Sequence, residues 1–408
     1  MSDEKQAPPP AEAPAPGAEA PGPASSRAAG GLAQPAGPPA GAAASHPAFE
    51  SLEGGAGPPA APGRLEPAPP PLPRRVLHAA FALALVGLVA LALGQVEAAL
   101  LTAIAAFYFV AQGADVHPAM RQVYALLAWI PPVLGAVALG ALARTLVVDA
   151  PLTAPRIAFA AFAALGALAS LATLAPSFTD RLVRALFRGA GPSNTLRLTA
   201  TAVMVTLWVG LPAWLAFRDQ LADLLKDPGA LVTPQKLSGG LVGYVLLAFA
   251  GVGCLVRRGW RESLARLGLT APRPADALVL VAGVVALWLF NAGSEALERS
   301  AYPALWAADQ GFTTALAGVM GPGLMVLLGL SAGIGEEITL RGALQPKLGI
   351  VPTSLLFAAL HVQYSWYGML SILGFGLILG TIRRRSSTTT AILVHALYDL
   401  LAVATARG

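Results

Sequence analysis

Charged residues are scarce in this chain: aspartate, glutamate, lysine and arginine make up 12% of its 408 residues, whereas 55% are hydrophobic. A soluble domain carries roughly 25% charged residues. The composition therefore excludes an ordinary soluble domain and predicts a protein that crosses a membrane several times. Cysteine is almost absent as well. The single Cys254 excludes an intrachain disulfide and a cysteine-based zinc site.

Lysine is the rarest charged residue, with 4 lysines against 23 arginines. The net charge of +5 does not indicate a nucleic-acid partner, because the arginines stand in short loops between apolar segments, as they do at the cytoplasmic face of membrane proteins. The excess of arginine and alanine is typical of a GC-rich bacterial genome.

Several catalytic signatures are also missing. The chain has no Gly-x-Ser-x-Gly turn, no phosphate-binding Walker A loop and no His-Glu-x-x-His pair. The residues that remain available for chemistry inside apolar segments are carboxylates and imidazoles.

The N-terminal 75 residues differ in composition from the rest of the chain, with 19 of the 35 prolines and 20 alanines. Proline removes backbone donors, and the segment has little apolar surface to bury. We therefore expect a disordered tail with polyproline II character. It begins with polar residues, so we expect no signal peptide.

Eleven apolar segments follow the tail. A bilayer core about 30 Å thick needs roughly 20 helical residues. We predict membrane helices near residues 76–93, 96–112, 124–143, 157–175, 196–217, 240–256, 277–292, 312–340, 352–366, 369–382 and 388–405. Arginine-rich loops alternate with neutral or acidic ones, which places the tail in the cytoplasm and the carboxyl terminus on the opposite side. The predicted fold class is all-α, a polytopic integral membrane helical bundle of about eleven transmembrane helices.

Two adjacent carboxylates, Glu336 and Glu337, follow an apolar stretch without charge. Ionised carboxylates are unfavourable in hydrocarbon, so acids there are rare and usually functional. Glu337 and Arg341 stand four residues apart, which predicts an ion pair on one helix face. Glu336 then lies about 100° around the helix and faces a different partner.

Two histidines stand in the apolar segments that follow. His361 comes four residues after Phe357, and Asp399 comes four residues after His395. Each pair is expected on one helix face. Counted from the basic side at 1.5 Å per residue, Glu336, His361 and His395 lie roughly 7–8, 13 and 15 Å deep. The spacing therefore predicts that three helices bring these side chains to similar depths.

Each of these groups also has a purely structural interpretation. Glu337 with Arg341 can simply end a helix, His361 can be a hydrogen-bonded core histidine, and His395 with Asp399 can join helices. Two histidines and three acids at matched depth, taken together, favour a functional site. Carboxylates and imidazoles can activate water for attack on an amide bond.

The same side chains offer a second chemistry. Glu336, His361, His395 and Asp399 could hold a divalent metal such as zinc with an open coordination position. The residues by themselves leave both possibilities open.

The complete pattern resembles the motifs of the CPBP family, also called the Abi or type II CAAX prenyl endopeptidase family. The family pattern reads Glu-Glu-x-x-x-Arg, then Phe-x-x-x-His, then His-x-x-x-Asn or Asp. It is present here as Glu336-Glu337-x-x-x-Arg341, Phe357-x-x-x-His361 and His395-x-x-x-Asp399. The likeness covers roughly residues 196–405 and is sharpest between 331 and 402.

The resemblance implies a helical intramembrane protease in which Glu336 and His361 activate water. It implies that His395 and Asp399 stabilise the oxyanion, with Glu337 and Arg341 as supporting structure. An ionised aspartate cannot donate a hydrogen bond to an oxyanion, whereas asparagine can. Asp399 is therefore protonated, orients His395 or binds a metal. Both a metalloprotease and a metal-free mechanism agree with the resemblance.

We thus expect three parts: the tail (1–75), a four-helix membrane extension (76–195) and a protease core (196–408). The predicted function is an intramembrane endopeptidase that cleaves a membrane-associated peptide or protein. Its predicted location is the bacterial inner membrane. Membrane lipids are the other expected partners. One alternative is a non-catalytic membrane scaffold or immunity partner, which predicts that Glu336→Ala is tolerated. The other is a proton-coupled transporter, which predicts inverted repeats that this chain lacks.

Overall fold

The computed structural model describes residues 72–149, 151–187 and 189–407. The chain divides into residues 1–66 and a compact unit of residues 67–408, and only the second unit is described below. The predicted disordered tail lies outside the described residues up to residue 71.

The described residues form helices and contain no β-strand. The helices are α1 (Arg74–Ala92), α2 (Val96–Ala114), α3 (Pro118–Leu127), α4 (Ile130–Val148), α5 (Ala154–Ala172), α6 (Pro176–Leu186), α7 (Asn194–Leu224), α8 (Pro234–Gly251), α9 (Trp260–Leu267), α10 (Pro274–Ala301), α11 (Pro303–Val319), α12 (Pro322–Glu337), α13 (Gln345–Leu348), α14 (Ile350–Ala359), α15 (Trp366–Arg385) and α16 (Thr388–Ala406). A short 3₁₀ turn (Pro228–Ala230) precedes α8, and a π-helix (Ile338–Leu344) joins α12 to α13.

Proline and small polar residues set many of the helix starts. Proline stands in the first turn of α3, α6, α8, α10, α11 and α12, where its missing N–H has no helical partner to lose. The side chain of Ser365 accepts a hydrogen bond from the Gly368 amide and caps the start of α15. The apolar segments are thus divided into helices at positions that the sequence marks.

Nine helical segments among the described residues are long and apolar enough to cross a membrane. Large apolar side chains on their surfaces stay exposed, such as Phe81 on α1 and Leu278 on α10. In water such surfaces would be unfavourable, whereas lipid solvates them. The predicted class, a polytopic helical membrane protein, is confirmed.

The number of segments differs from the predicted eleven for local reasons. The predicted span 352–366 contains α14, whose ten residues reach only about 15 Å. The predicted span 312–340 remains one crossing but changes its bounds: Gly321 and Pro322 begin a new helix after α11, and the apolar segment runs from Pro322 to Leu348. The predicted span 240–256 corresponds to α8, whose first turn carries polar residues and lowers its hydropathy.

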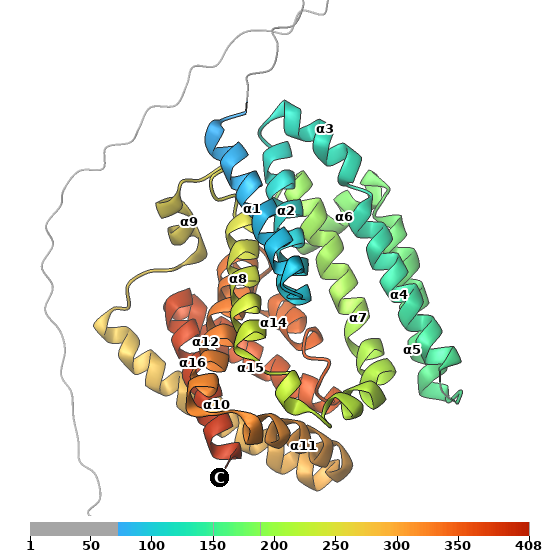
Figure 1. The fold of residues 1–408 in the computed structure, drawn as a ribbon, viewed down its shortest axis with the longest axis vertical. Coiled ribbons are helices and arrows are strands. Elements are labelled where there is room, and N and C mark those ends of the chain that lie inside the picture. The colour runs from blue at the N-terminus through green and yellow to red at the C-terminus, as the bar shows by residue number, and fades with distance from the viewer. Residues whose placement is uncertain (1–71, 150, 188, 408) are drawn as a thin grey trace, which may run out of the picture. The chain divides into compact units, whose positions relative to one another are not determined.

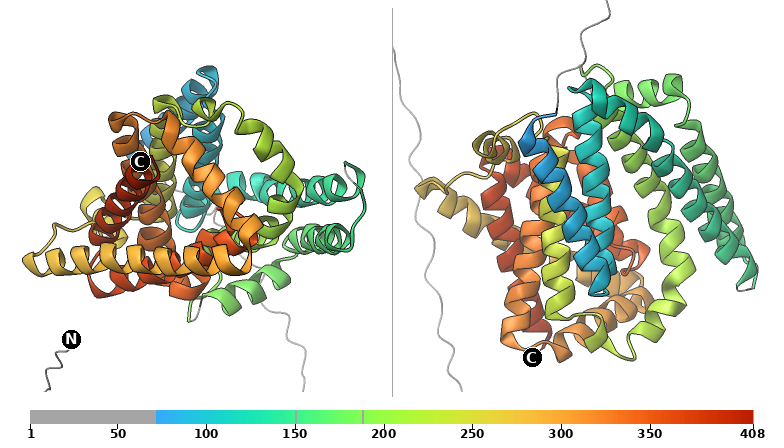
Figure 2. Two further views of the ribbon diagram at one scale, coloured as in Figure 1. Left: turned by 90° about the horizontal axis from the view of Figure 1, so that it is seen from below. Right: turned by 45° about the horizontal axis from the view of Figure 1, so that its top comes forward.

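The helices that hold the three sequence motifs pack against neighbouring helices of the same unit. Helix α12 packs against α16 and α8, and α14 packs against α15 and α7. Figure 1 shows α12, α14, α15 and α16 in orange and red beside α8. The α4–α5 pair lies at one edge of this unit, as both views in Figure 2 also show.

Helix α2 lies between α1 and α8 and so links the amino-terminal helices to the helices that hold the motifs. It packs along α1 and α8, and a Cβ atom on Gly243 of α8 would stand 2.7 Å from Leu101 Cβ of α2. A side chain at position 243 would therefore force these two helices apart.

Candidate active site

Glycines in α12 bring the paired glutamates close to α16. A Cβ atom on Gly329 would stand 2.7 Å from the Ala396 carbonyl oxygen, and one on Gly333 would stand 2.8 Å from Ala396 Cβ. Only residues without a side chain allow backbones to approach this closely. Helix α12 then ends at Glu337 and continues as the π-helix. Such π-helical turns occur frequently at functional sites.

Glu337 is the centre of a buried charged network. Its Oε1 atom accepts a hydrogen bond from Arg341 Nη1 at 2.8 Å and a second from His395 Nδ1 at 2.9 Å. Glu337 and Arg341 are 0% and 1% exposed. The ion pair expected from the spacing of these two residues forms. The hydrogen bond from His395 to Glu337 extends this pair and joins α12 to α16.

The second ring nitrogen of His395 faces its own helix. His395 Nε2 lies 3.4 Å from Asp399 Oδ2, so the imidazole stands between two carboxyl groups. The distance is long for an N–H···O hydrogen bond, which is usually 2.7–3.2 Å. A stronger acceptor placed near Nε2 can therefore compete with Asp399 for its hydrogen.

His361 does not lie on a helix face, contrary to the prediction from its spacing with Phe357. Helix α14 ends at Ala359, and the His361 amide closes a turn onto the Ala358 carbonyl. His361 Nδ1 lies 2.7 Å from the Phe357 carbonyl oxygen. A carbonyl only accepts, so Nδ1 carries the hydrogen and Nε2 keeps a lone pair in the neutral ring.

Phe357 brings the motif residues together. Its ring centroid lies 4.7 Å from that of His361 and 5.9 Å from that of His395. The Arg341 guanidinium carbon stands 4.3 Å above the same ring. Phe357 is 3% exposed. One buried ring thus contacts side chains from all three motifs and fixes their spacing.

Glu336 lies beside this network with an unused acceptor. Its Oε2 atom is buried and has no hydrogen-bond partner among the described residues. It interacts electrostatically with His395 and Asp399. A buried carboxylate oxygen without a partner is unfavourable unless a water molecule or a ligand satisfies it.

Two tyrosines near Glu336 were not found from the sequence. Tyr244 on α8 packs against Gly335 and interacts electrostatically with Glu336. Tyr364, in the turn after His361, interacts with Glu336 and Asp399. Neither residue belongs to a spaced motif. The one sequence signal that could have found either of them is the position of Tyr364, three residues after His361.

The four candidate metal ligands do not fit a metal site as they are arranged here. Both ring nitrogens of His395 face carboxyl oxygens at 2.9 and 3.4 Å, which leaves this ring no lone pair directed at a metal ion. The carbonyl that holds His361 Nδ1, by contrast, leaves the lone pair of His361 Nε2 available. Across the part of the chain that the structure describes, no three His, Cys, Asp or Glu side chains are grouped closely enough to hold a metal ion. No step of the proposed chemistry is therefore assigned to a metal.

One known family matches the segment that contains the three motifs. Residues 318–401 match the family model for Rce1-like type II CAAX prenyl endopeptidases. This match confirms the resemblance predicted from the motifs. It spans α12, the π-helix, α13, α14, α15 and most of α16, and it includes Glu336, His361, His395 and Asp399. No curated protein and no solved structure matches the chain.

Proposed function

We propose that this membrane protein is an endopeptidase that hydrolyses a peptide bond within the bilayer. The observation that carries the proposal is the buried, unpartnered Glu336 Oε2 beside the Glu337–His395–Asp399 network. A water molecule held there would satisfy that oxygen and would be placed next to a base. The family match over residues 318–401 supports the same chemistry.

In the proposed mechanism Glu336 takes a proton from water while the water oxygen attacks the carbonyl carbon. His361 Nε2 orients that water, since its Nδ1 is fixed by the Phe357 carbonyl. The oxyanion that forms accepts a hydrogen bond from His395 Nε2. Glu336 then returns its proton to the leaving nitrogen as the carbon–nitrogen bond breaks. Asp399 orients His395 and does not contact the oxyanion.

We further propose a bacterial inner membrane location with a cytoplasmic N-terminal side. The substrate is a peptide or membrane-anchored protein that reaches the site from the bilayer. The support is the distribution of charge: Val76 of α1 packs in one cluster with Val256, next to Arg257 and Arg258. The start of α1 therefore lies at the same end as a basic loop, as a cytoplasmic face requires.

The test is cleavage of a quenched-fluorescent peptide library by the purified protein in detergent. Glu336→Gln removes the base but keeps the size of the side chain, and we expect cleavage to fall at least about 100-fold. Glu295→Gln is the matched control, because glutamine can still accept the hydrogen bond from Asn291. Equal cleavage by Glu336→Gln and the wild type would refute the assigned base. The same assay with a chelator reports on metal dependence.

A further inference from the structure

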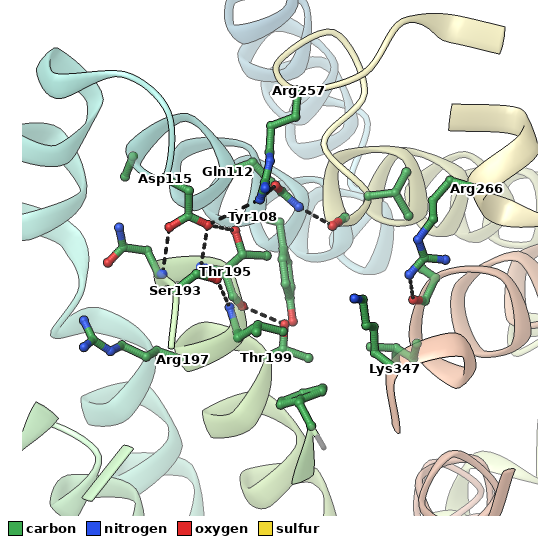
Figure 3. Close-up of a pocket in the computed structure, with 18 of the residues that line it drawn as sticks. Tyr108, Gln112, Asp115, Ser193, Thr195, Arg197, Thr199, Arg257, Arg266 and Lys347 are labelled. Atoms are coloured by element: carbon green, nitrogen blue, oxygen red, sulfur yellow. Dashed lines mark hydrogen bonds and ion pairs between the residues drawn. The ribbon is translucent and has the colours of Figure 1, made fainter. Parts of the chain in front are cut away.

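A separate cavity of about 590 Å³ lies where α2 ends and α7 begins. Its apolar wall includes Tyr108, Phe187 and Leu247. Thr339, two residues after Glu337, also lines it. Figure 3 shows that its polar side chains come from α2, from the start of α7 and, with Lys347, from the matched segment.

The cavity is strongly basic. Among the described residues, six cationic side chains and one carboxylate line it. The cations are Arg121, Arg197, Arg257, Arg258, Arg266 and Lys347.

The one lining carboxylate is already engaged. Asp115 accepts hydrogen bonds from the Asn194 amide at 2.8 Å and from Thr195 Oγ1 at 2.7 Å, which caps the start of α7. Its nearest cation is Arg257, at 3.8 Å. Arg197 pairs with Asp180, at 2.7 Å, outside the lining.

The other four cations have no carboxylate partner among the described residues. Arg258 and Arg266 donate only to backbone carbonyls, those of Val252 and of Gly342 and Ala343. Burial lowers the pKa of Arg266, and the charges of Arg258 and Arg383 lower it further. The charges of Arg258 and Arg266 therefore repel each other.

Lys347 has its three donors unused by the described residues. It stands on α13, and Figure 3 shows its ammonium group extending into the space between Tyr108 and Arg266 in this view. A cation in this position is available to a ligand.

The four unopposed cations come from four different elements: α3, the loop after α8, α9 and α13. A planar carboxylate presents its acceptor positions, about four of them, in a single plane. A phosphate group presents oxygens in several directions and accepts forked bonds from arginine and a point contact from lysine. A cavity lined by cations from four elements therefore suits a tetrahedral anion.

We propose that this cavity binds a phosphate-bearing anion, either the headgroup of an acidic phospholipid or free inorganic phosphate. The proposal does not depend on the hydrolytic activity, because none of its residues carries the proposed chemistry. A bound anion would neutralise the cations that α3, α9 and α13 bring together. It would thereby stabilise the contact between the amino-terminal helices and the segment that continues from Glu337.

The experiment is calorimetric titration of the purified full-length protein in a neutral detergent. The ligands are soluble dihexanoyl phosphatidylglycerol, inorganic phosphate and zwitterionic dihexanoyl phosphatidylcholine. We expect Lys347→Glu to weaken binding at least about tenfold, since it replaces a charged donor with a repelling group. Lys347→Gln should weaken it less and in the same direction. The matched control is Arg261→Glu, an exposed cation on α9 that does not line the cavity.

The outcomes distinguish the two sources of the anion. Lys347-dependent binding of phosphatidylglycerol alone supports a lipid headgroup, and such binding of inorganic phosphate supports the free ion. The proposal is overturned if neither ligand binds, if phosphatidylcholine binds as well as phosphatidylglycerol, or if Lys347→Glu and Arg261→Glu weaken binding equally.

Discussion

Four ionisable side chains, Arg341, Glu337, His395 and Asp399, form one continuous chain of contacts in the site. A buried ion is tolerated when partners surround it, and removal of one partner leaves the next charge uncompensated. His395 is held through both ring nitrogens and has little freedom to rotate. This fixed orientation is what a donor to a developing oxyanion needs.

Two substitutions distinguish an Asp399 that orients His395 from an Asp399 that carries a proton. If Asp399 only orients His395, then Asp399→Asn keeps an oxygen that accepts from Nε2 and should retain most activity. Asp399→Ala removes that acceptor and should lower kcat by about 10–100-fold, as loss of an orienting partner usually does. The measurement is kcat for both variants with one peptide substrate. Equal inactivation by the two substitutions would contradict the orienting role.

At the scale of elements, the close approach of α12 and α16 sets the Glu337–His395 distance. Gly333→Ala would place a methyl group 2.9 Å from the Ala396 nitrogen and 2.8 Å from its Cβ. We expect a loss of about 1–3 kcal/mol in stability from overpacking. The longer Glu337–His395 separation should also lower kcat. Thermal unfolding in detergent and the cleavage assay measure the two effects.

Gly323→Ala is the matched control for that substitution. It lies on the same helix, and a Cβ atom there meets nothing within 4 Å. If the two variants showed the same melting temperature and kcat, the α12–α16 contact would not position the site.

The turn that carries His361 is held by a second element, α11. Asp309 accepts hydrogen bonds from the Ser365 amide at 2.8 Å and from Ser365 Oγ at 2.7 Å. Helix α11 is not among the segments that can cross a membrane. Burial raises the pKa of Asp309 above its ordinary value. The fold therefore favours the protonated carboxyl group.

This shift predicts how stability depends on pH. A carboxyl group whose pKa is raised by folding stabilises the folded state at pH values below its unfolded pKa of about 4. This stabilisation is lost as the pH rises through its folded pKa. Asp309→Asn imitates the protonated form, so its melting temperature relative to wild type should increase from pH 4 to pH 8. Asp223→Asn, at an exposed acid, is the control. A difference that stays constant or shrinks with pH would show that Asp309 does not titrate in this way.

At the scale of the whole molecule, α1 starts at one end of the described unit and α16 finishes at the other. Figure 1 shows α1 starting at the top and the carboxyl end of α16 at the bottom. Arg407 donates to the Met320 carbonyl between α11 and α12, whereas Val76 packs beside the basic loop after α8. An odd number of crossings would produce this arrangement.

The proposed orientation has a direct test in bacterial cells. Alkaline phosphatase fused after residue 408 should be active, because that enzyme folds only outside the cytoplasm. The same reporter fused after Arg385, at the basic end of α15, should be inactive. The reverse pattern would show that the N-terminal side faces outward. The division into a membrane extension (76–195) and a core (196–408) stays a prediction.

The sequence alone determined the membrane class, the starts of many helices and the identity of the motif residues. These features depend on composition and on residues a few positions apart. It also predicted the Glu337–Arg341 pair, whose partners stand one helical turn apart. It failed for His361, because helical spacing alone did not mark the end of α14 at Ala359. The turn that follows is held at its far end by the Ser365 cap of α15 and by the contact of Ser365 with Asp309.

Only the tertiary structure decided which side chains meet. Glu337 and His395 are 58 residues apart in the chain, and their contact depends on glycines in α12 that let α16 approach. The central place of Phe357, the nearby tyrosines and the basic cavity likewise combine residues from several helices. The physical reason is that helical periodicity orients a side chain around its own axis, whereas packing between helices decides which residue it faces.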